Sequence, residues 1–164
     1  MKVHPLALEA LHHLPAPKGS IVVVIPDSTR PMDLDQALQA IHSWAGDRVS
    51  GVQIGLGLHR ESTQAELQSL RHICPWEIQD HDPDDCVALG EVDGIPVEVA
   101  RPVATADHIV TVGRVELHQY AGFSGGYKGV VVGCGGRRLI EALHERSVVT
   151  QPVGSRRFVR AGPR

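Results

Sequence analysis

Histidine, glycine and lysine residues gather between His118 and His144, and these residue types can together bind and transform an anionic ligand. Gly125 and Gly126 lie in a glycine-rich turn, where the backbone can approach a ligand closely. Consecutive N–H groups in such a turn can form a nest for an anion, and Lys128 follows as a cationic donor. The pattern predicts an anion-binding turn. It is not a Walker A loop, because the lysine is neither preceded by Gly nor followed by Ser or Thr.

Two further polar turns follow apolar runs nearer the N-terminus. Asp27 to Arg30 comes directly after the β-branched run 21–25, and His59 with Arg60 follows a second apolar run. The guanidinium of Arg30 suits a phosphate or carboxylate, and Asp27 could accept a hydrogen bond from a ribose or orient that arginine. A plain turn, in which Asp27 bonds its own backbone, explains the same residues. Both interpretations stay open at this point.

The elements that must position these turns alternate between strands and helices. We predict strands over residues 21–25, 49–56, 108–112 and 130–132, and a hairpin over 92–99. We predict helices within 1–19, from a cap at Asp33 to Gly46, over 64–73 after a Thr63–Glu66 capping box, and from Gly136 to His144. Strands without polar alternation are typical of sheets covered on both faces. The pattern therefore predicts an α/β fold with a Rossmann-like, mostly parallel sheet and flanking helices in a single domain. The polar turns then fall at the carboxyl ends of strands, where such sheets bind ligands.

Length and composition set the domain organisation. The 164 residues suffice for one domain, and 42% hydrophobic against 21% charged residues is typical of a globular chain. We expect an N-terminal helix and linker over residues 1–19, the α/β domain over 20–149, and a disordered arginine-rich tail over 150–164.

The net charge and the cysteines indicate which classes of partner and which cellular compartment to expect. A formal charge of −3 disfavours nucleic acid as a partner, because its recognition calls for a basic surface. The three cysteines share no CxxC spacing, which fits a reducing cytoplasm. We find no signal-peptide pattern and no apolar run of membrane-spanning length, so we expect a cytoplasmic protein without membrane contact.

An ordered set of motifs extends over residues 20–146. The motifs are Asp27-Ser28-Thr29-Arg30-Pro31, Gly57-Leu58-His59-Arg60, His81-Asp82, Gly94-Ile95-Pro96-Val97, Ala106-Asp107, and the segment HQYAGFSGGYK from His118 to Lys128. In this order and spacing the sequence resembles the nickel-pincer-nucleotide-dependent lactate racemases, over their N-terminal domain. Each motif alone is weak, whereas the ordered set is specific.

The resemblance implies a role for each site residue. The cofactor would be a nickel-pincer nucleotide, with His144 as the protein's metal ligand and Lys128 engaging the cofactor. The turn with Asp27, Thr29 and Arg30 matches the one that holds the phosphate and ribose side. Gly125 and Gly126 would give clearance for the cofactor, and His59 and His118 match the two catalytic histidines. For His144, a helix-end histidine favoured by the helix dipole remains the structural alternative.

The implied activity is racemisation or epimerisation of a small 2-hydroxy acid by proton-coupled hydride transfer, which would make the protein a nickel-dependent isomerase. A base takes the hydroxyl proton while hydride leaves Cα, and a second group acts on the other face. Histidine suits both roles because its pKa lies near neutrality. Family enzymes are longer and carry a second domain, so activity would need that domain or a partner chain. Two alternatives stay open: a non-catalytic nucleotide- or metal-binding module or truncated fragment, and a generic α/β nucleotide-binding domain.

Overall fold

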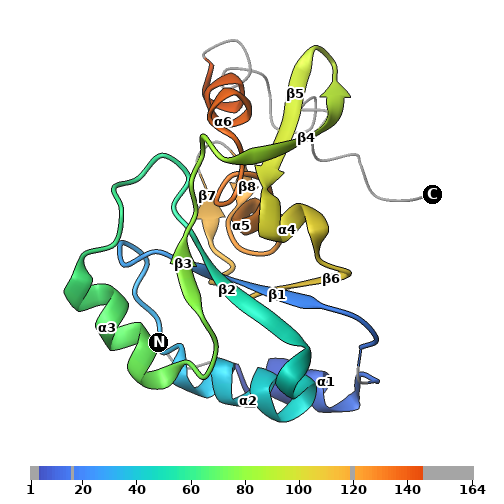
Figure 1. Ribbon diagram of the computed structural model, residues 1–164, viewed down its shortest axis with the longest axis vertical. Coiled ribbons are helices and arrows are strands. Elements are labelled where there is room, and N and C mark those ends of the chain that lie inside the picture. Colours follow the sequence, from blue (N-terminus) through green and yellow to red (C-terminus); the bar gives the residue numbers. More distant parts are fainter. Residues whose placement is uncertain (1–3, 16, 119–120, 146–164) are drawn as a thin grey trace.

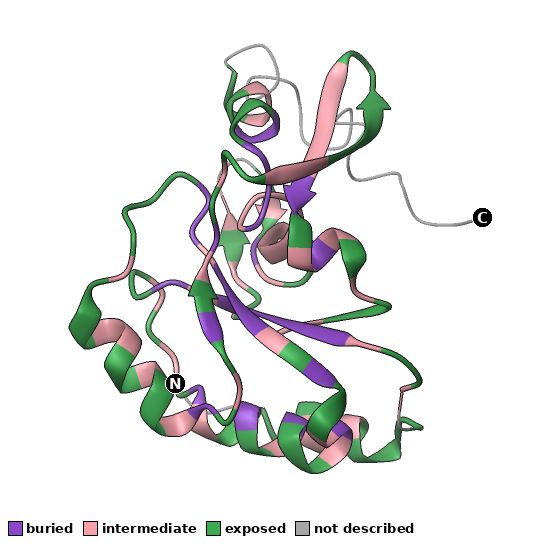
Figure 2. Cartoon of the chain, viewed as in Figure 1, coloured by how far each residue is buried: buried purple, intermediate pink, exposed green. Residues whose placement is uncertain are grey.

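A four-stranded parallel sheet forms the centre of the protein. The computed structural model describes residues 4–15, 17–118 and 121–145 (Figure 1). The sheet has the order β3-β2-β1-β6, with β1 (Ile21–Pro26), β2 (Val49–Gly55), β3 (Ile78–Asp80) and β6 (His108–Thr111). All three strand pairings are parallel. The β-branched run of β1 is almost fully buried, as expected for a strand that has a neighbour on either side and is covered on both faces (Figure 2).

Helices and a hairpin cover the two faces of this sheet. On one side lie α1 (Pro5–His13), α2 (Asp35–Ala45) and α3 (Gln64–Ile73) (Figure 1). On the other lie α4 (Arg101–Thr105), α5 (Tyr127–Val131), α6 (Arg137–His144) and the hairpin of β4 (Cys86–Val92) and β5 (Ile95–Ala100). A 3-10 turn, η1 (Gly46–Arg48), precedes β2, and a small ribbon of β7 (Leu117–His118) and β8 (Gly122–Phe123) precedes α5. This arrangement confirms the predicted α/β fold with a parallel sheet.

Two apolar clusters, one on each face of the sheet, form the core. Ile21, Val23 and Ile25 of β1 face one way and pack with Leu38 of α2 and its neighbours. Alternate residues of the same strand face the other way, and that cluster contains Val22, Val24, Val99, Ala100, Val103 and Cys134. Because side chains alternate along a strand, a single run of five apolar residues serves both clusters. None of the helices in the described part of the chain is long and apolar enough to span a bilayer.

Most predicted elements are confirmed, and two details are wrong. The Thr63 capping box is present, and α3 begins and ends as predicted. Asp33, in contrast, makes no cap for α2, because the helix starts one residue later, with Leu34 at the N-cap position and no side-chain cap. The predicted strand over 130–132 is also wrong, since Val130 and Val131 belong to α5. That short helix packs against β1 and β6 rather than pairing with a strand, so tertiary contacts override the β-propensity of valine. The predicted tail over 150–164 lies outside the described residues.

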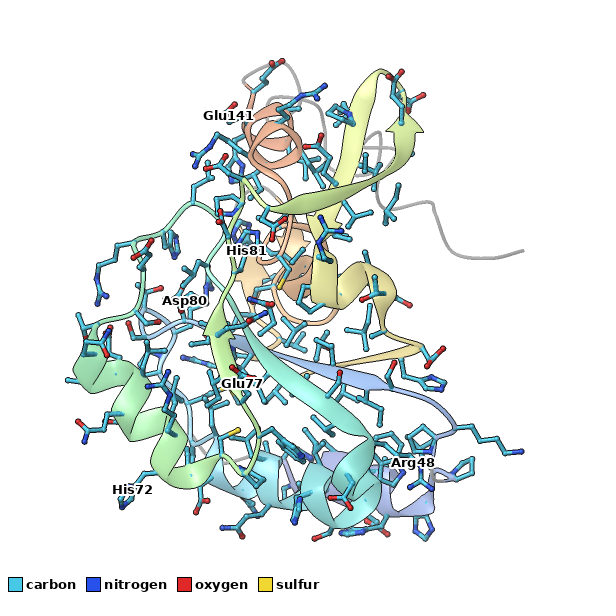
Figure 3. The ribbon with its side chains drawn as sticks, in the orientation of Figure 1. Arg48, His72, Glu77, Asp80, His81 and Glu141 are labelled. Carbon is cyan, nitrogen blue, oxygen red and sulfur yellow. The ribbon has the colours of Figure 1, made fainter. Side chains whose placement is uncertain are left out.

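His81, just beyond β3, gives the fold a specific sensitivity to acid. Figure 3 labels His81 next to Asp80, the last residue of β3. The side chain is 2% exposed, and its Nδ1 has no hydrogen-bond partner among the described residues. Burial lowers the pKa of His81, although a backbone hydrogen bond with Gly135 opposes this.

We expect the free energy of unfolding to fall as the pH drops below about 6.5, the value of an unperturbed histidine. Between that pH and the lower folded-state pKa, the unfolded chain binds the proton and the native chain does not. Chemical unfolding from pH 8 to 5 should show this slope in the native chain and a flatter one in His81→Gln. Equal slopes would contradict the assignment. The pKa values of three carboxyl groups are also lowered, those of Asp27, Asp84 and Asp107. Their ordinary pKa is 3.8, so they affect the free energy of unfolding at lower pH than His81 does.

Candidate functional site

A cleft of about 440 Å³ lies at the carboxyl ends of β1, β2 and β6. Its walls come from the turns after these strands, from the β7–β8 ribbon, from α5 and from the end of α6. All predicted site residues except Thr29 line it: Asp27, Arg30, His59, His118, Gly125, Gly126, Lys128 and His144. The size is that of a small-molecule or cofactor pocket. Parallel strands place their carboxyl ends together, which is why turns far apart in sequence meet here.

Asp27 and His59 form a hydrogen-bonded pair across this edge of the sheet. Oδ2 of Asp27 lies 2.7 Å from Nδ1 of His59. Oδ1 accepts from the backbone N–H of Thr29 at 2.8 Å and from the Thr29 hydroxyl. Burial raises the pKa of Asp27, but the hydrogen bonds from Thr29 and His59 outweigh it, so the pKa lies below its ordinary value. Because an ionised carboxylate only accepts, Nδ1 of His59 carries the proton and the lone pair of the neutral ring lies on Nε2.

This pair resolves the two interpretations of the Asp27 turn. The turn is a local backbone motif, since Thr29 bonds back to Asp27. The second carboxylate oxygen reaches His59. Thr29 therefore contributes by holding Asp27 and not by lining the cleft. The sequence did not show that Asp27 and His59 meet, although both follow adjacent parallel strands, and that placement was the available signal.

Arg30 and Lys128 place two cations in the cleft. Lys128 is half-buried, and burial lowers its pKa; the nearby charge of Arg30 lowers it further, while Asp27 partly opposes the shift. Neither cation forms an ion pair with another described residue, whereas other surface arginines do. Two positive charges that form no ion pair with a described carboxylate favour an anionic ligand, such as a phosphate or a carboxylate.

The β7–β8 ribbon carries His118 and leads into the glycine-rich turn. Ser124 is buried and ties the ribbon together, donating from its hydroxyl to the Arg114 carbonyl and accepting from the Glu116 N–H. Gly125 has a φ of +79°, and a Cβ there would lie 2.8 Å from the Arg114 carbonyl oxygen. Only glycine fits this position. The role of Ser124 and the cleft-lining side chains of Arg114 and Glu116 were not anticipated from the sequence.

His118 is held by a contact from its own turn. The backbone N–H of Ala121 donates to Nδ1 of His118 at 3.2 Å. Burial lowers the pKa of His118, and the charges of Lys128, Arg30 and His144 lower it further. The imidazole is therefore biased towards its neutral form at physiological pH.

The ring of His144 is held by a hydrogen bond to its own helix. It is the last residue of α6, and its Nδ1 lies 2.7 Å from the Ile140 carbonyl oxygen. The carbonyl can only accept, so Nδ1 carries the proton and the lone pair lies on Nε2, as in metal-bound histidines. Within the described residues no three His, Cys, Asp or Glu side chains are grouped to hold an ion. A metal at His144 would therefore take its other ligands from a bound cofactor.

The loop after β3 fixes the start of α6. Arg137 makes two hydrogen bonds to the carboxylate of Asp84, at 2.8 and 2.6 Å, and its backbone N–H donates to Pro83. The motif residue His81 belongs to this loop and does not line the cleft. Arg60 also lies outside the cleft, because its guanidinium binds both oxygens of Glu66. The motif around His81 thus supports the helix that carries His144.

The fold defines an α/β protein with a cleft at the carboxyl edge of its sheet, where such sheets bind ligands. Comparison with known proteins gives the family. The sequence profile of the lactate racemase N-terminal domain matches residues 3–155. The chain belongs to this family. It is 29% identical over 160 residues to the lactate racemase of Lactiplantibacillus plantarum and 26% identical to that of Thermoanaerobacterium thermosaccharolyticum. Each of these matches covers 91% of this chain and 38% of the relative.

The fold comparison agrees with the sequence. The structure of the lactate racemase apoprotein from Thermoanaerobacterium thermosaccharolyticum superposes with a TM-score of 0.72 at 25% identity. It covers 93% of this chain, and this chain covers 38% of that one. The family predicted from the motifs is therefore confirmed. The chain spans well under half the length of the relatives it matches.

Proposed function

We propose that this chain is the cofactor-binding part of a racemase or epimerase that acts on a small 2-hydroxy acid. One observation carries the proposal: a carboxylate-bound histidine, a second histidine, two cations and a metal-type histidine line the same cleft. The relatives named lactate racemase support the isomerase class. We also propose the cytoplasmic location expected from the sequence.

The described residues fit a nickel-pincer nucleotide as the cofactor. His144 offers one imidazole lone pair, and planar sites with nitrogen and sulfur donors suit Ni(II). Arg30 and Lys128 offer positive charge for a phosphate, and Gly125 and Gly126 border the cleft without side chains. Such a cofactor supplies a reversible acceptor for the hydride on Cα of the substrate.

The chain's own groups would handle the charges and the protons. Lys128 would hold the cofactor, and Arg30 its phosphate and ribose side. His59 would take the substrate hydroxyl proton on Nε2, and Asp27 would stabilise the imidazolium that forms. His118, on the β7–β8 ribbon, would serve the other face of the planar keto acid. Both histidines line the same cleft, which supports a shared role at a single carbon.

Nickel content tests the proposal directly. We expect protein made together with cofactor-synthesis enzymes to retain about one nickel per chain and a cofactor absorbance band. His144→Ala should lose the metal, because the structure offers no substitute cluster among the described residues. His72→Ala, on the exposed surface of α3, is the matched control and should keep it. Native protein without nickel under these conditions would falsify cofactor binding.

The outer face of the β7–β8 ribbon supports a partner chain or second domain. Residues 114, 116 and 118 line the cleft, so Val115 and Leu117 point the other way and are 78% and 86% exposed. Phe123 pairs with Leu117 across the ribbon and is 62% exposed. We call these three residues the outer ribbon face. Apolar residues gathered at one site are typical of a surface that another body covers, and the relatives extend well beyond the 38% of their length that this chain matches.

Substitutions in the outer ribbon face test whether it binds a partner polypeptide. We expect Leu117→Ser combined with Phe123→Ser to weaken association with the rest of such an enzyme at least tenfold, because apolar burial is lost. The measurement is a binding titration against the polypeptide that completes the racemase. Leu89→Ser with Val92→Ser, at the exposed tip of the β4–β5 hairpin, is the control. An equal loss in both double variants would contradict a specific surface.

A non-catalytic carrier remains the second candidate. The two cations and the histidine that would hold a cofactor line the cleft whether or not turnover follows. A racemisation assay of the nickel-loaded chain, with and without its partner, separates the two. Turnover in either sample supports the enzyme, and nickel without turnover in both supports the carrier.

A further inference from the structure

The two cleft histidines differ in the group that binds Nδ1. At His59 the neighbour is the Asp27 carboxylate, which only accepts, so Nδ1 must donate. At His118 the neighbour is the Ala121 backbone N–H, which only donates, so Nδ1 must accept. A neutral imidazole has one proton to place. In His59 it lies on Nδ1, and in His118 it lies on Nε2.

We propose that Asp27 and the Ala121 amide hold the two histidines in opposite neutral tautomers, so that His59 is a proton acceptor at Nε2 and His118 a proton donor at Nε2. Asp27 is then a positioning residue. It acts through His59, and its buried carboxylate is fixed in turn by two hydrogen bonds from Thr29.

The consequence for turnover rests on the proposed function. In the resting protein only His59 is prepared to take a hydroxyl proton. His118 presents an N–H that can bind the oxygen of a substrate or of a planar keto acid. His118 becomes a base only after its proton moves from Nε2 to Nδ1, which requires the Ala121 hydrogen bond to break. The hydrogen bond from Ala121 to His118 would therefore have to break when the protein acts on the enantiomer whose hydroxyl faces His118.

The tautomers can be measured without cofactor or activity. Long-range 1H–15N spectra of the full chain separate protonated from unprotonated ring nitrogens, and His59→Gln and His118→Gln assign the signals. We expect the Nδ1–H form at His59 and the Nε2–H form at His118 above pH 7. The same tautomer at both positions, or a mixture at either, overturns the proposal. This readout stands apart from nickel binding and turnover, so its failure is distinguishable from failure of the proposed function.

Variants test the cause of the difference. Asp27→Ala should leave His59 as a mixture of tautomers, whereas Asp27→Asn keeps a carbonyl acceptor and should retain the Nδ1–H form. Asp80→Ala is the matched control, because it removes a carboxylate that holds the neighbouring loop through Ser62 and does not contact His59. A change of the His59 tautomer in Asp80→Ala equal to that in Asp27→Ala would overturn the role of Asp27.

Two variants of Ala121 test the cause of the tautomer at His118. Ala121→Pro removes the donating N–H and should release the single tautomer of His118, while Ala121→Gly keeps the N–H and should not. An unchanged His118 signal in a folded Ala121→Pro protein contradicts the assignment. If the proline variant does not fold, a single Nδ1–H tautomer of His118 in the native chain would still refute the proposal.

Discussion

Replacing His59 with glutamine is expected to lower racemisation of a 2-hydroxy acid by about 10²–10⁴-fold in the nickel-loaded, complete assembly, and His118→Gln should do the same. The reason is geometric. Each imidazole lies on the wall of one cleft, and glutamine can hydrogen-bond there but cannot take up a proton near neutral pH. Initial rates of formation of one enantiomer from the other measure the loss.

Two controls make the catalytic prediction specific. Nickel content must match that of the native protein, so that the loss reports on chemistry and not on cofactor binding. Arg60→Gln changes the residue next to His59 but lies outside the cleft, so its rate should stay within about twofold. Full rates in both histidine variants, at equal nickel, would show that neither histidine acts on the substrate.

The second large effect is expected at Gly133, where the turn between α5 and α6 packs on the backbone. A Cβ at this position would lie 2.3 Å from the Gly129 carbonyl oxygen, which no rotation of a side chain can relieve. We expect Gly133→Ala to lower the free energy of unfolding by about 1–3 kcal/mol, the range for overpacked sites. Urea unfolding at pH 7.5 measures the change.

Gly133 also connects to the site, so its effect should extend beyond stability. Its carbonyl accepts from the Gly57 N–H at 2.9 Å, in the turn that presents His59, and Gly133 borders the cleft itself. We expect weaker nickel retention in Gly133→Ala at temperatures where the chain is still folded. Gly51→Ala on β2 is the control, because its nearest contact, a carbonyl at 3.6 Å, is ordinary. Equal stability of the two variants would rule out the packing argument.

Local patterns predicted the central elements of the fold. The unbroken apolar run of β1 indicated a strand covered on both faces, and the Thr63–Glu66 pair set the start of α3. Both signals are local, since each needs only a few consecutive residues. β3 was missed because three residues carry no measurable period. Val130 to Val132 were misassigned because their helix is fixed by packing on the sheet, which no local propensity contains.

The site was predictable as a set of turns but not as a set of contacts. Parallel strands bring their carboxyl ends to one edge, so the gathering of the turns after β1, β2 and β6 followed from the strand pattern alone. The hydrogen-bond partner of each site side chain did not follow from that pattern. Asp27 and His59 are 32 residues apart, and their contact depends on the register of β1 against β2. Likewise, the ion pair between Arg60 and Glu66 depends on the direction in which α3 continues from the loop that carries Arg60.

Under the proposed function, a polypeptide that covers the outer ribbon face would also affect the position of His118. Each strand of the ribbon is only two residues long, and an isolated pair of strands is marginally stable in water. Covering Val115, Leu117 and Phe123 would stiffen the same backbone that points His118 into the cleft. By thermodynamic reciprocity, a ligand that needs His118 in place would then tighten binding of the covering polypeptide by the same factor. Under that proposal, the ribbon would couple the position of His118 to assembly.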